Sequence, residues 1–285
     1  DFFLTSHMPL KLMYITNQPD VAKIAENYKV DRIFIDLETI GKSDRQANYN
    51  SVKSNHSFID ISKIRKTLSS SELLVRINQM HDKTKLEIDE AVHRGADIIM
   101  LPMYRSAEEA NFFVDLVNGR AKTILLLETI DAEKDLEKTL SSSGADEIHI
   151  GLNDLHIEYK LSFMFQLLAN GKVDEICEKI KPYNIMYGFG GIAGLDRGIL
   201  PGRYIIAEHY RLGSTMAILS RSFCDAKIIK NLDKIEAIFS NDIPQIRKYE
   251  EFLVKAPHEF FEKNRKETIE IIEKVITNIS SLQNH

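Results

Sequence analysis

The chain has 285 residues, of which 44% are hydrophobic, so it can bury a large core. Its 37 Lys and Arg residues stand against 42 Asp and Glu residues, and this net charge of −5 gives no reason to expect nucleic acid or an anionic membrane as a partner. We predict no transmembrane helix, because no apolar run is long enough. The two cysteines, Cys177 and Cys224, are far apart, which indicates reduced thiols and a cytoplasmic protein.

Eight short apolar segments alternate with helical patterns along the chain. The predicted strands cover 12–16, 32–37, 73–77, 98–101, 123–127, 147–150, 185–188 and 216–219. The predicted helices cover 19–28, a stretch that ends near 68, 83–93, a stretch that begins at 106, 131–140 and 202–212. Such short apolar runs, connected through helices, are typical of parallel strands that are buried on both faces.

A glycine precedes three of these strands, at the point where the preceding helix should end. Gly95, Gly144 and Gly213 each stand three residues before an apolar run, and glycine readily takes the left-handed conformation that closes a helix. Eight strands that alternate with helices favour an α/β fold of the (β/α)8 TIM barrel type over an open doubly wound sheet.

The chain is predicted to divide into a barrel and a helical arm. Residues 8–225 form the (β/α)8 barrel with the catalytic site, and residues 226–285 form a C-terminal helical arm for packing or oligomerisation. The arm has one apolar edge, made by Ile269, Ile272, Val275 and Ile276. The opening residues have neither the basic start nor the apolar stretch of a signal peptide, and we predict Met8 as the native start.

Charged side chains follow four of the predicted strands where each strand ends. Asp36 and Glu38 follow the second strand, Arg76 ends the third, Glu128 follows the fifth, and Asp154 comes shortly after the sixth. A carboxylate pair from neighbouring strands can hold a cation such as Mg²⁺, and an Arg grips a carboxylate through two hydrogen bonds. A metal with an Arg beside it suits a 2-oxo acid, whose keto and carboxylate oxygens can chelate the metal.

Each of these residues also has a purely structural interpretation. Asp36 and Glu38 could cap the segment that follows, Glu128 and Asp154 could cap the helices after them, and Arg76 could be an ion-pair partner. Their conjunction at the carboxyl ends of strands, where the active sites of barrels lie, favours a functional site.

At these residues the sequence resembles the HpcH/HpaI aldolase and citrate lyase family, a group of pyruvate/phosphoenolpyruvate-type barrels. The resemblance covers roughly residues 11 to 224 and rests on the segments IDLE at 35–38, LVR at 74–76, MLPM at 100–103, LET at 127–129 and IGLNDL at 150–155. It implies a divalent metal, Mg²⁺ or Mn²⁺, bound by Glu128 and Asp154. It also implies that Arg76 contacts the oxo acid.

The resemblance further implies that Asp36 and Glu38 position metal-bound water or neighbouring groups. We therefore predict Arg76, Asp36 and Glu38 as the catalytic residues. Substrate binding is assigned to Arg76 together with Gly151, Asn153 and Gly190.

The chain also departs from the family pattern. Aldolase members usually carry a proton-transferring His directly after the residue that matches Glu38, whereas this chain has Thr39, which cannot titrate near neutral pH. Residues 42–45 (KSDR) resemble the citrate lyase-like members, but those tend to have Lys where Met103 stands. The fold and the metal site transfer to this chain, and the acid/base chemistry does not.

Several residues could replace the missing proton carrier. His56 lies in the polar stretch after the second strand, His156 comes two residues after Asp154, and Tyr104 and His81 follow the fourth and third strands. Each is also open to a structural interpretation, as a loop or helix-surface residue. His149 lies in mid-strand, which indicates the barrel interior or a strand face.

Glycines gather after the predicted seventh strand, at 188, 190, 191 and 194. A dinucleotide loop should follow the first strand and open directly into a helix, so we interpret this stretch as a substrate-binding loop or a tight turn. Arg197, which follows it, could contact an anionic substrate or be solvated.

The sequence thus predicts a metal-dependent carbon–carbon lyase of the class II aldolase type. It would form or cleave a bond alpha to the keto group of a pyruvate-like 2-oxo acid through a metal-stabilised enolate. The alternatives are a citrate lyase or malyl-CoA lyase-like enzyme that acts on an acyl-CoA thioester, and a catalytically impaired homologue that binds the oxo acid. We expect an aldehyde or a CoA thioester as second substrate, and a homo-oligomer.

Overall fold

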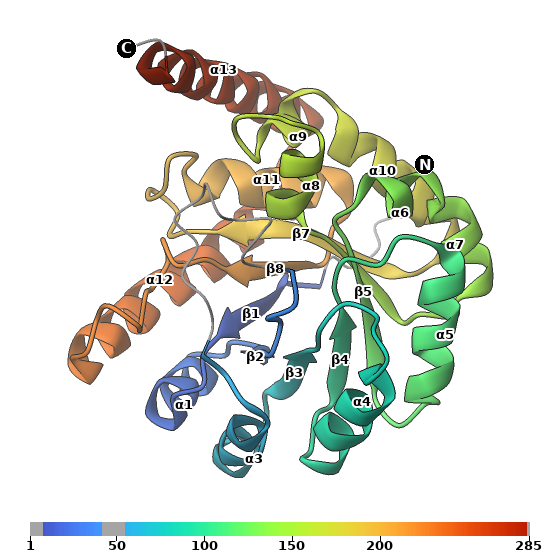
Figure 1. The fold of residues 1–285 in the computed structure, drawn as a ribbon. Helices are drawn as coiled ribbons and strands as arrows, with labels where there is room; N and C mark the ends of the chain where they lie inside the picture. Colours follow the sequence, from blue (N-terminus) through green and yellow to red (C-terminus); the bar gives the residue numbers. More distant parts are fainter. Residues whose placement is uncertain (1–7, 42–54, 284–285) are drawn as a thin grey trace.

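Eight parallel strands close into a barrel in the computed structural model, which describes residues 8–41 and 55–283 (Figure 1). Residues 1–7 and the segment 42–45 noted above lie outside the described residues. Each strand pairs with the next one along the chain, and β8 closes the barrel against β1. The strands are β1 (Lys11–Ile15), β2 (Arg32–Asp36), β3 (Glu72–Arg76), β4 (Ile98–Leu101), β5 (Lys122–Leu127), β6 (Glu147–Ile150), β7 (Met186–Ile192) and β8 (Met216–Leu219). The predicted (β/α)8 barrel is confirmed.

Helices surround the barrel and connect its strands (Figure 1). They are α1 (Pro19–Asn27), α3 (Phe58–Thr67), α4 (Thr84–His93), α5 (Ala107–Val117), α6 (Ile130–Lys134), α7 (Leu136–Ser142), α8 (Leu152–Glu158), α9 (Gln166–Ala169), α10 (Lys172–Ile180), the 3₁₀ helix η1 (Lys181–Tyr183), α11 (Gly202–Leu212), α12 (Leu232–Leu253) and α13 (His258–Gln283). Ser106 caps the amino end of α5, since its side chain accepts from the Glu109 N–H.

The prediction for the seventh strand was wrong in its extent. We expected a strand over 185–188 followed by a glycine loop, but β7 continues through the glycines to Ile192. A Cβ on Gly188 would lie 2.2 Å from the Met216 carbonyl oxygen, so only glycine lets β7 approach β8 this closely at that point. The glycine-rich stretch is therefore largely strand and not a loop.

Apolar side chains fill the middle of the barrel. They come from alternate positions of several strands and include Met13, Phe34, Leu74, Met100, Ile124, Leu126 and Met216. A second and larger apolar layer lies between the outer faces of the strands and the helices. Packing on both faces holds the strands in place, and the charged side chains predicted for the site lie at the ends of these strands.

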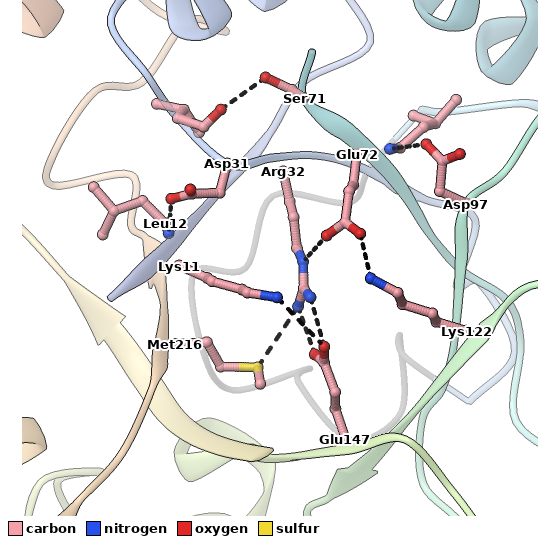
Figure 2. Close-up of polar contacts among 12 residues, drawn as sticks. Lys11, Leu12, Asp31, Arg32, Ser71, Glu72, Asp97, Lys122, Glu147 and Met216 are labelled. Carbon is pink, nitrogen blue, oxygen red and sulfur yellow. Dashed lines mark hydrogen bonds and ion pairs between the residues drawn. The ribbon is translucent and has the colours of Figure 1, made fainter. Parts of the chain in front are cut away.

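A group of charged side chains, which we call the basal cluster, closes the barrel at the amino ends of the strands (Figure 2). It consists of Lys11, Arg32, Glu72, Lys122 and Glu147. Arg32 donates from Nη1 and Nη2 to the two oxygens of Glu147, both at 2.6 Å, and from Nε to Glu72 at 2.9 Å. Burial alone would lower the pKa of Arg32, but the Glu147 and Glu72 carboxylates outweigh it and hold the pKa above its usual value.

Two long helices follow the barrel, as the periodicity of the last residues predicts. Contacts join α12 to α1 and α11, and join α13 to α11 and α9. Figure 1 shows α13 at the edge of the molecule, extending past α9. Ile272 is buried, and Val275 and Ile276 are partly buried against the core, so three of the four residues of the predicted apolar edge face the protein, and Ile269 is half-buried. No helix in the described ranges is long and apolar enough to cross a membrane.

Candidate active site

The carboxyl ends of β2 and β3 bring an Arg and two carboxylates together. Asp36 and Arg76 are register partners on these strands. The guanidinium of Arg76 donates from Nε and Nη2 to the two carboxylate oxygens of Asp36, both at 2.9 Å. Glu38 Oε2 lies 3.5 Å from Arg76 Nη2, and the Glu38 N–H donates to Asp36 Oδ1 at 3.2 Å. The three residues predicted as catalytic therefore form one contiguous group.

The Arg76 guanidinium remains charged at this site. Burial would lower its pKa, but the charges of Asp36, Glu38 and Glu128 outweigh burial and raise it. Its central carbon lies 5.4 Å from the centre of the Phe34 ring, which supports the guanidinium from the barrel interior. Nη1 makes no hydrogen bond to any residue of the described ranges, so one edge of the guanidinium can still bind a ligand.

Glu128 follows β5 and is held by its neighbours on both sides. The Met103 N–H donates to Glu128 Oε1 at 3.1 Å, and Met103 adopts a left-handed φ of 53° to do so. A Cβ on Gly151 would lie 2.6 Å from Glu128 Oε2. Gly151 thus leaves the space that the carboxylate occupies, which gives it a steric role beside the site.

Asp154 lies in the first turn of α8, directly after β6, and is almost fully buried. Since Leu127 and Ile150 pair in register, Glu128 and Asp154 come from neighbouring strand ends. Across the described ranges, no group of three or more His, Cys, Asp or Glu side chains is arranged to share a metal ion. Mg²⁺ needs only one or two carboxylates, with water and substrate oxygens in its other positions, and the donor chemistry of this pair fits that pattern.

Thr39, which stands where aldolases carry His, has a structural role. Its N–H donates to Asn78 Oδ1 at 2.8 Å, and the N–H of Ile40 donates to the same oxygen at 2.9 Å. Glu87 holds Asn78 in turn, accepting from its Nδ2 at 2.8 Å, and His81 Nε2 lies 3.1 Å from the same Glu87 oxygen. The loop after β2 is thereby fastened to the loop after β3, and His81 stands beside Glu87 without a hydrogen bond from Nε2 to any described residue.

His56 is the candidate proton carrier that the structure places against the predicted catalytic group. The Asp36 N–H donates to His56 Nδ1 at 3.0 Å. Because a backbone N–H can only donate, Nδ1 is unprotonated and the proton of the neutral ring is on Nε2. The side chain is half-buried at the carboxyl end of β2.

The other candidate proton carriers are buried. His156 Nδ1 bonds to the Leu152 carbonyl at 3.2 Å, and burial lowers the His156 pKa despite the opposing hydrogen bonds to backbone carbonyls. Tyr104 is fully buried, and burial raises its pKa. His149 lies inside the barrel, where Nε2 is 3.2 Å from the Gly190 carbonyl oxygen. The Gly190 backbone is therefore turned toward a buried ring.

Two further residues were candidates for contact with the substrate. Asn153, predicted to bind substrate, is exposed on α8. Arg197 forms an ion pair with Asp242 of α12 and donates to the Phe223 carbonyl at 3.1 Å. Sequence reasoning missed His209 of α11, which is fully buried and stacks on Phe189 with ring centres 3.8 Å apart. Its position in an amphipathic helix gave no signal to separate it from a surface His.

Comparisons with known proteins agree with the fold. A Burkholderia cenocepacia J2315 protein of the HpcH/HpaI aldolase/citrate lyase family superposes with a TM-score of 0.62 at 13% identity, over 80% of this chain and 95% of that one. The HpcH/HpaI aldolase from Desulfitobacterium hafniense DCB-2 superposes with a TM-score of 0.57 at 16% identity, over 80% and 93%. Citrate synthase SbnG superposes with a TM-score of 0.59 at 15% identity, over 82% and 94%.

Family membership follows from the sequence. A comparison with curated proteins gives no match. The family model described as HpcH/HpaI aldolase/citrate lyase matches residues 11–163, which is more than half of the chain and includes the strand ends that carry Asp36, Arg76, Glu128 and Asp154. The chain therefore belongs to the HpcH/HpaI aldolase/citrate lyase family.

Proposed function

We propose that this barrel is a divalent-metal-dependent carbon–carbon lyase of the class II aldolase type that acts on a pyruvate-like 2-oxo acid. Family membership supports lyase-type chemistry. The observation that carries the proposal is the Asp36–Arg76 pair beside Glu38 at the mouth of the barrel, with the Glu128 charge close enough to raise the Arg76 pKa. This arrangement brings together a guanidinium that can bind the carboxylate of an oxo acid and carboxylate oxygens that can bind a divalent cation.

Glu128 and Asp154 are the residues that would hold the metal. Both are buried carboxylates from neighbouring strand ends, and the Met103 N–H orients one of them. When bound, a divalent cation would supply the positive charge that stabilises an enolate developing on the substrate.

Arg76 would bind the substrate carboxylate. Asp36 occupies Nε and Nη2 of its guanidinium, which fixes the plane of the fork and leaves Nη1 directed away from that pair. Lys could supply the charge but not the planar geometry. Asp36 and Glu38 therefore act as positioning residues for Arg76, and Arg76 as the residue that orients the oxo acid.

Proton exchange of pyruvate tests the proposal. Its methyl signal is followed by proton NMR in D₂O, with the full chain and Mg²⁺ or Mn²⁺. We expect exchange that requires the metal and is lost in Glu128→Gln. Glu208→Gln is the matched control, because Glu208 is equally buried but lies on α11 in an ion pair with Arg211.

The outcomes separate the two other interpretations of the family site. Binding of pyruvate and metal without any exchange would show an impaired homologue, which is consistent with Thr39 in place of the usual His. Absence of pyruvate binding would contradict the proposal and direct the search to acyl-CoA thioesters. Exchange that persists in Glu128→Gln would remove that residue from the metal site.

A further inference from the structure

His149 is a buried polar side chain in the interior of the barrel. It pairs in register with Leu126 of β5 and Gly188 of β7, and Leu126 belongs to the apolar cluster that fills the barrel. Alternate residues of a strand share a face, so His149 lies on the same face of β6 as Glu147 and Gly151. Glu147 belongs to the basal cluster and Gly151 lies against the Glu128 carboxylate. His149 therefore stands between the base of the barrel and the candidate active site.

A bulge in β7 fixes the tautomer of this ring. The register of β7 against β8 shifts between Gly188 and Gly191, and Gly190 within the bulge has a φ of 53°. This conformation, which favours glycine, turns the Gly190 carbonyl to within 3.2 Å of His149 Nε2. Because a carbonyl can only accept, the proton is on Nε2, and Nδ1 presents a lone pair.

The lone pair of Nδ1 is a buried acceptor. Among the described residues it has no hydrogen-bond partner. Burial lowers the His149 pKa to about 4, the bond to Gly190 opposes this, and the charges of Arg32 and Arg76 add to the lowering. The neighbouring His209 is also held neutral by burial and by His149. Leaving a buried acceptor unpaired costs free energy, so we expect a donor to meet it inside the barrel.

We propose that His149 is a specificity-determining residue whose Nδ1 accepts a hydrogen bond from a hydroxyl group of the substrate, so that the site selects a 2-oxo acid hydroxylated next to its keto carbon. This inference rests on the proposed function, because it takes the acid to be anchored by Arg76 and by the metal that Glu128 and Asp154 would hold. Two residues of a strand span about 7 Å, so His149 lies one layer below Gly151, and we take the far end of the anchored acid to extend toward it.

The chemistry of the Nδ1 acceptor explains the direction of the preference. A ligand with a hydroxyl group satisfies Nδ1, whereas an alkyl group covers the acceptor without pairing it. Sites that hydrogen-bond a substrate hydroxyl discriminate strongly against analogues that lack it. A buried acceptor of this kind corresponds to a preference of roughly 10- to 100-fold in affinity.

Titration calorimetry of the full chain with Mg²⁺ tests this with 3-hydroxypyruvate and pyruvate. The wild type should bind the hydroxylated acid at least about tenfold more tightly. His149→Asn keeps an acceptor near the Nδ1 position and should retain most of the preference. His149→Gln can still donate to Gly190 but lacks that acceptor, and should bring the two affinities within about twofold. His209→Asn is the matched control and should keep the wild-type ratio.

The failures of the two proposals can be told apart. Equal affinities in the wild type, or a preference unchanged in His149→Gln, would overturn the role of His149 and leave the oxo-acid site intact. Failure of the wild type to bind either acid would overturn both proposals. A loss of the preference in His209→Asn as large as in His149→Gln would attribute it to packing and overturn the specific role of Nδ1.

Discussion

Removing Glu147 from the basal cluster should strongly destabilise the protein. The side chains of Arg32 and Glu147 are both fully buried, and two hydrogen bonds of 2.6 Å join them. In Glu147→Gln the guanidinium of Arg32 keeps its charge, because Arg does not deprotonate in proteins. Its remaining carboxylate partner is Glu72, which is 30% exposed and is shared with Lys122.

The magnitude follows from the cost of a buried charge that has lost its partner. Removing one member of a buried pair typically costs about 3 to 5 kcal/mol, whereas replacing both members by apolar residues is often neutral. The contact that remains with Glu72 places Glu147→Gln near the lower end, at about 3 kcal/mol. For a domain whose total stability is roughly 5 to 15 kcal/mol, this is a large share.

Urea unfolding of four proteins measures the effect: the wild type, Glu147→Gln, Arg32→Met and Arg32→Met/Glu147→Leu. We expect each single variant to lose several kcal/mol and the double variant to lose far less than their sum, with unchanged m-values. Losses below about 1 kcal/mol in both single variants, or strictly additive losses, would refute the reasoning. The cluster lies at the end of the barrel opposite the candidate site, so metal binding at that site should be unaffected in the folded fraction.

Three further changes test the interior and the mouth. Gly151→Ala should weaken Mn²⁺ binding, measured by electron paramagnetic resonance, because its Cβ would lie 2.6 Å from Glu128 Oε2; unchanged affinity would separate this carboxylate from the metal. Gly188→Ala should lower thermal stability by about 1 to 3 kcal/mol, because its Cβ would lie 2.2 Å from the Met216 carbonyl; calorimetry that shows wild-type stability would contradict the close approach. Burial lowers the pKa of His149 from 6.5 to about 4. Between these pH values His149 is protonated in the unfolded chain and neutral in the folded one, so the free energy of unfolding falls by about 3 kcal/mol as the pH drops from 6.5 to 4. His149→Phe should remove that part of the pH dependence in urea titrations, and an unchanged profile would contradict the shift.

The strands were predictable because short buried runs lie between clear helix stops. The strands Ile98–Leu101, Glu147–Ile150 and Met216–Leu219 agree with the prediction at both ends, and each follows a glycine that adopts a positive φ. Asp36, Glu38 and Arg76 also lie together as predicted, because the carboxyl ends of parallel strands all lie at the same end of a barrel. Local pattern and topology sufficed for both.

Other features depend on contacts between segments that no local pattern reveals. The glycines of β7 look like a loop in sequence, and only the closeness of Met216 and Leu152 shows why a strand needs them. Thr39 stands where the family usually has its His, and the sequence did not reveal that Asn78 from the next loop holds the Thr39 backbone. His149 gave no sign of its hydrogen bond to a bulge 41 residues later in the chain.

The arginines of β2 and β3, of which Arg32 is fully buried and Arg76 half-buried, show how the fold separates structure from chemistry. At the amino ends, Arg32 of β2 faces Glu72 of β3, and at the carboxyl ends Asp36 of β2 faces Arg76 of β3, so the same strand pair carries an ion pair at each end with the charges exchanged. All three nitrogens of the Arg32 guanidinium donate to carboxylates of the basal cluster. Arg76 donates to Asp36 from only two of its nitrogens, and Nη1 has no hydrogen-bond partner in the part of the chain that the structure describes. A fully satisfied guanidinium stabilises the barrel, whereas a partly satisfied one, held in plane and kept charged by three carboxylates, is prepared to bind an anion.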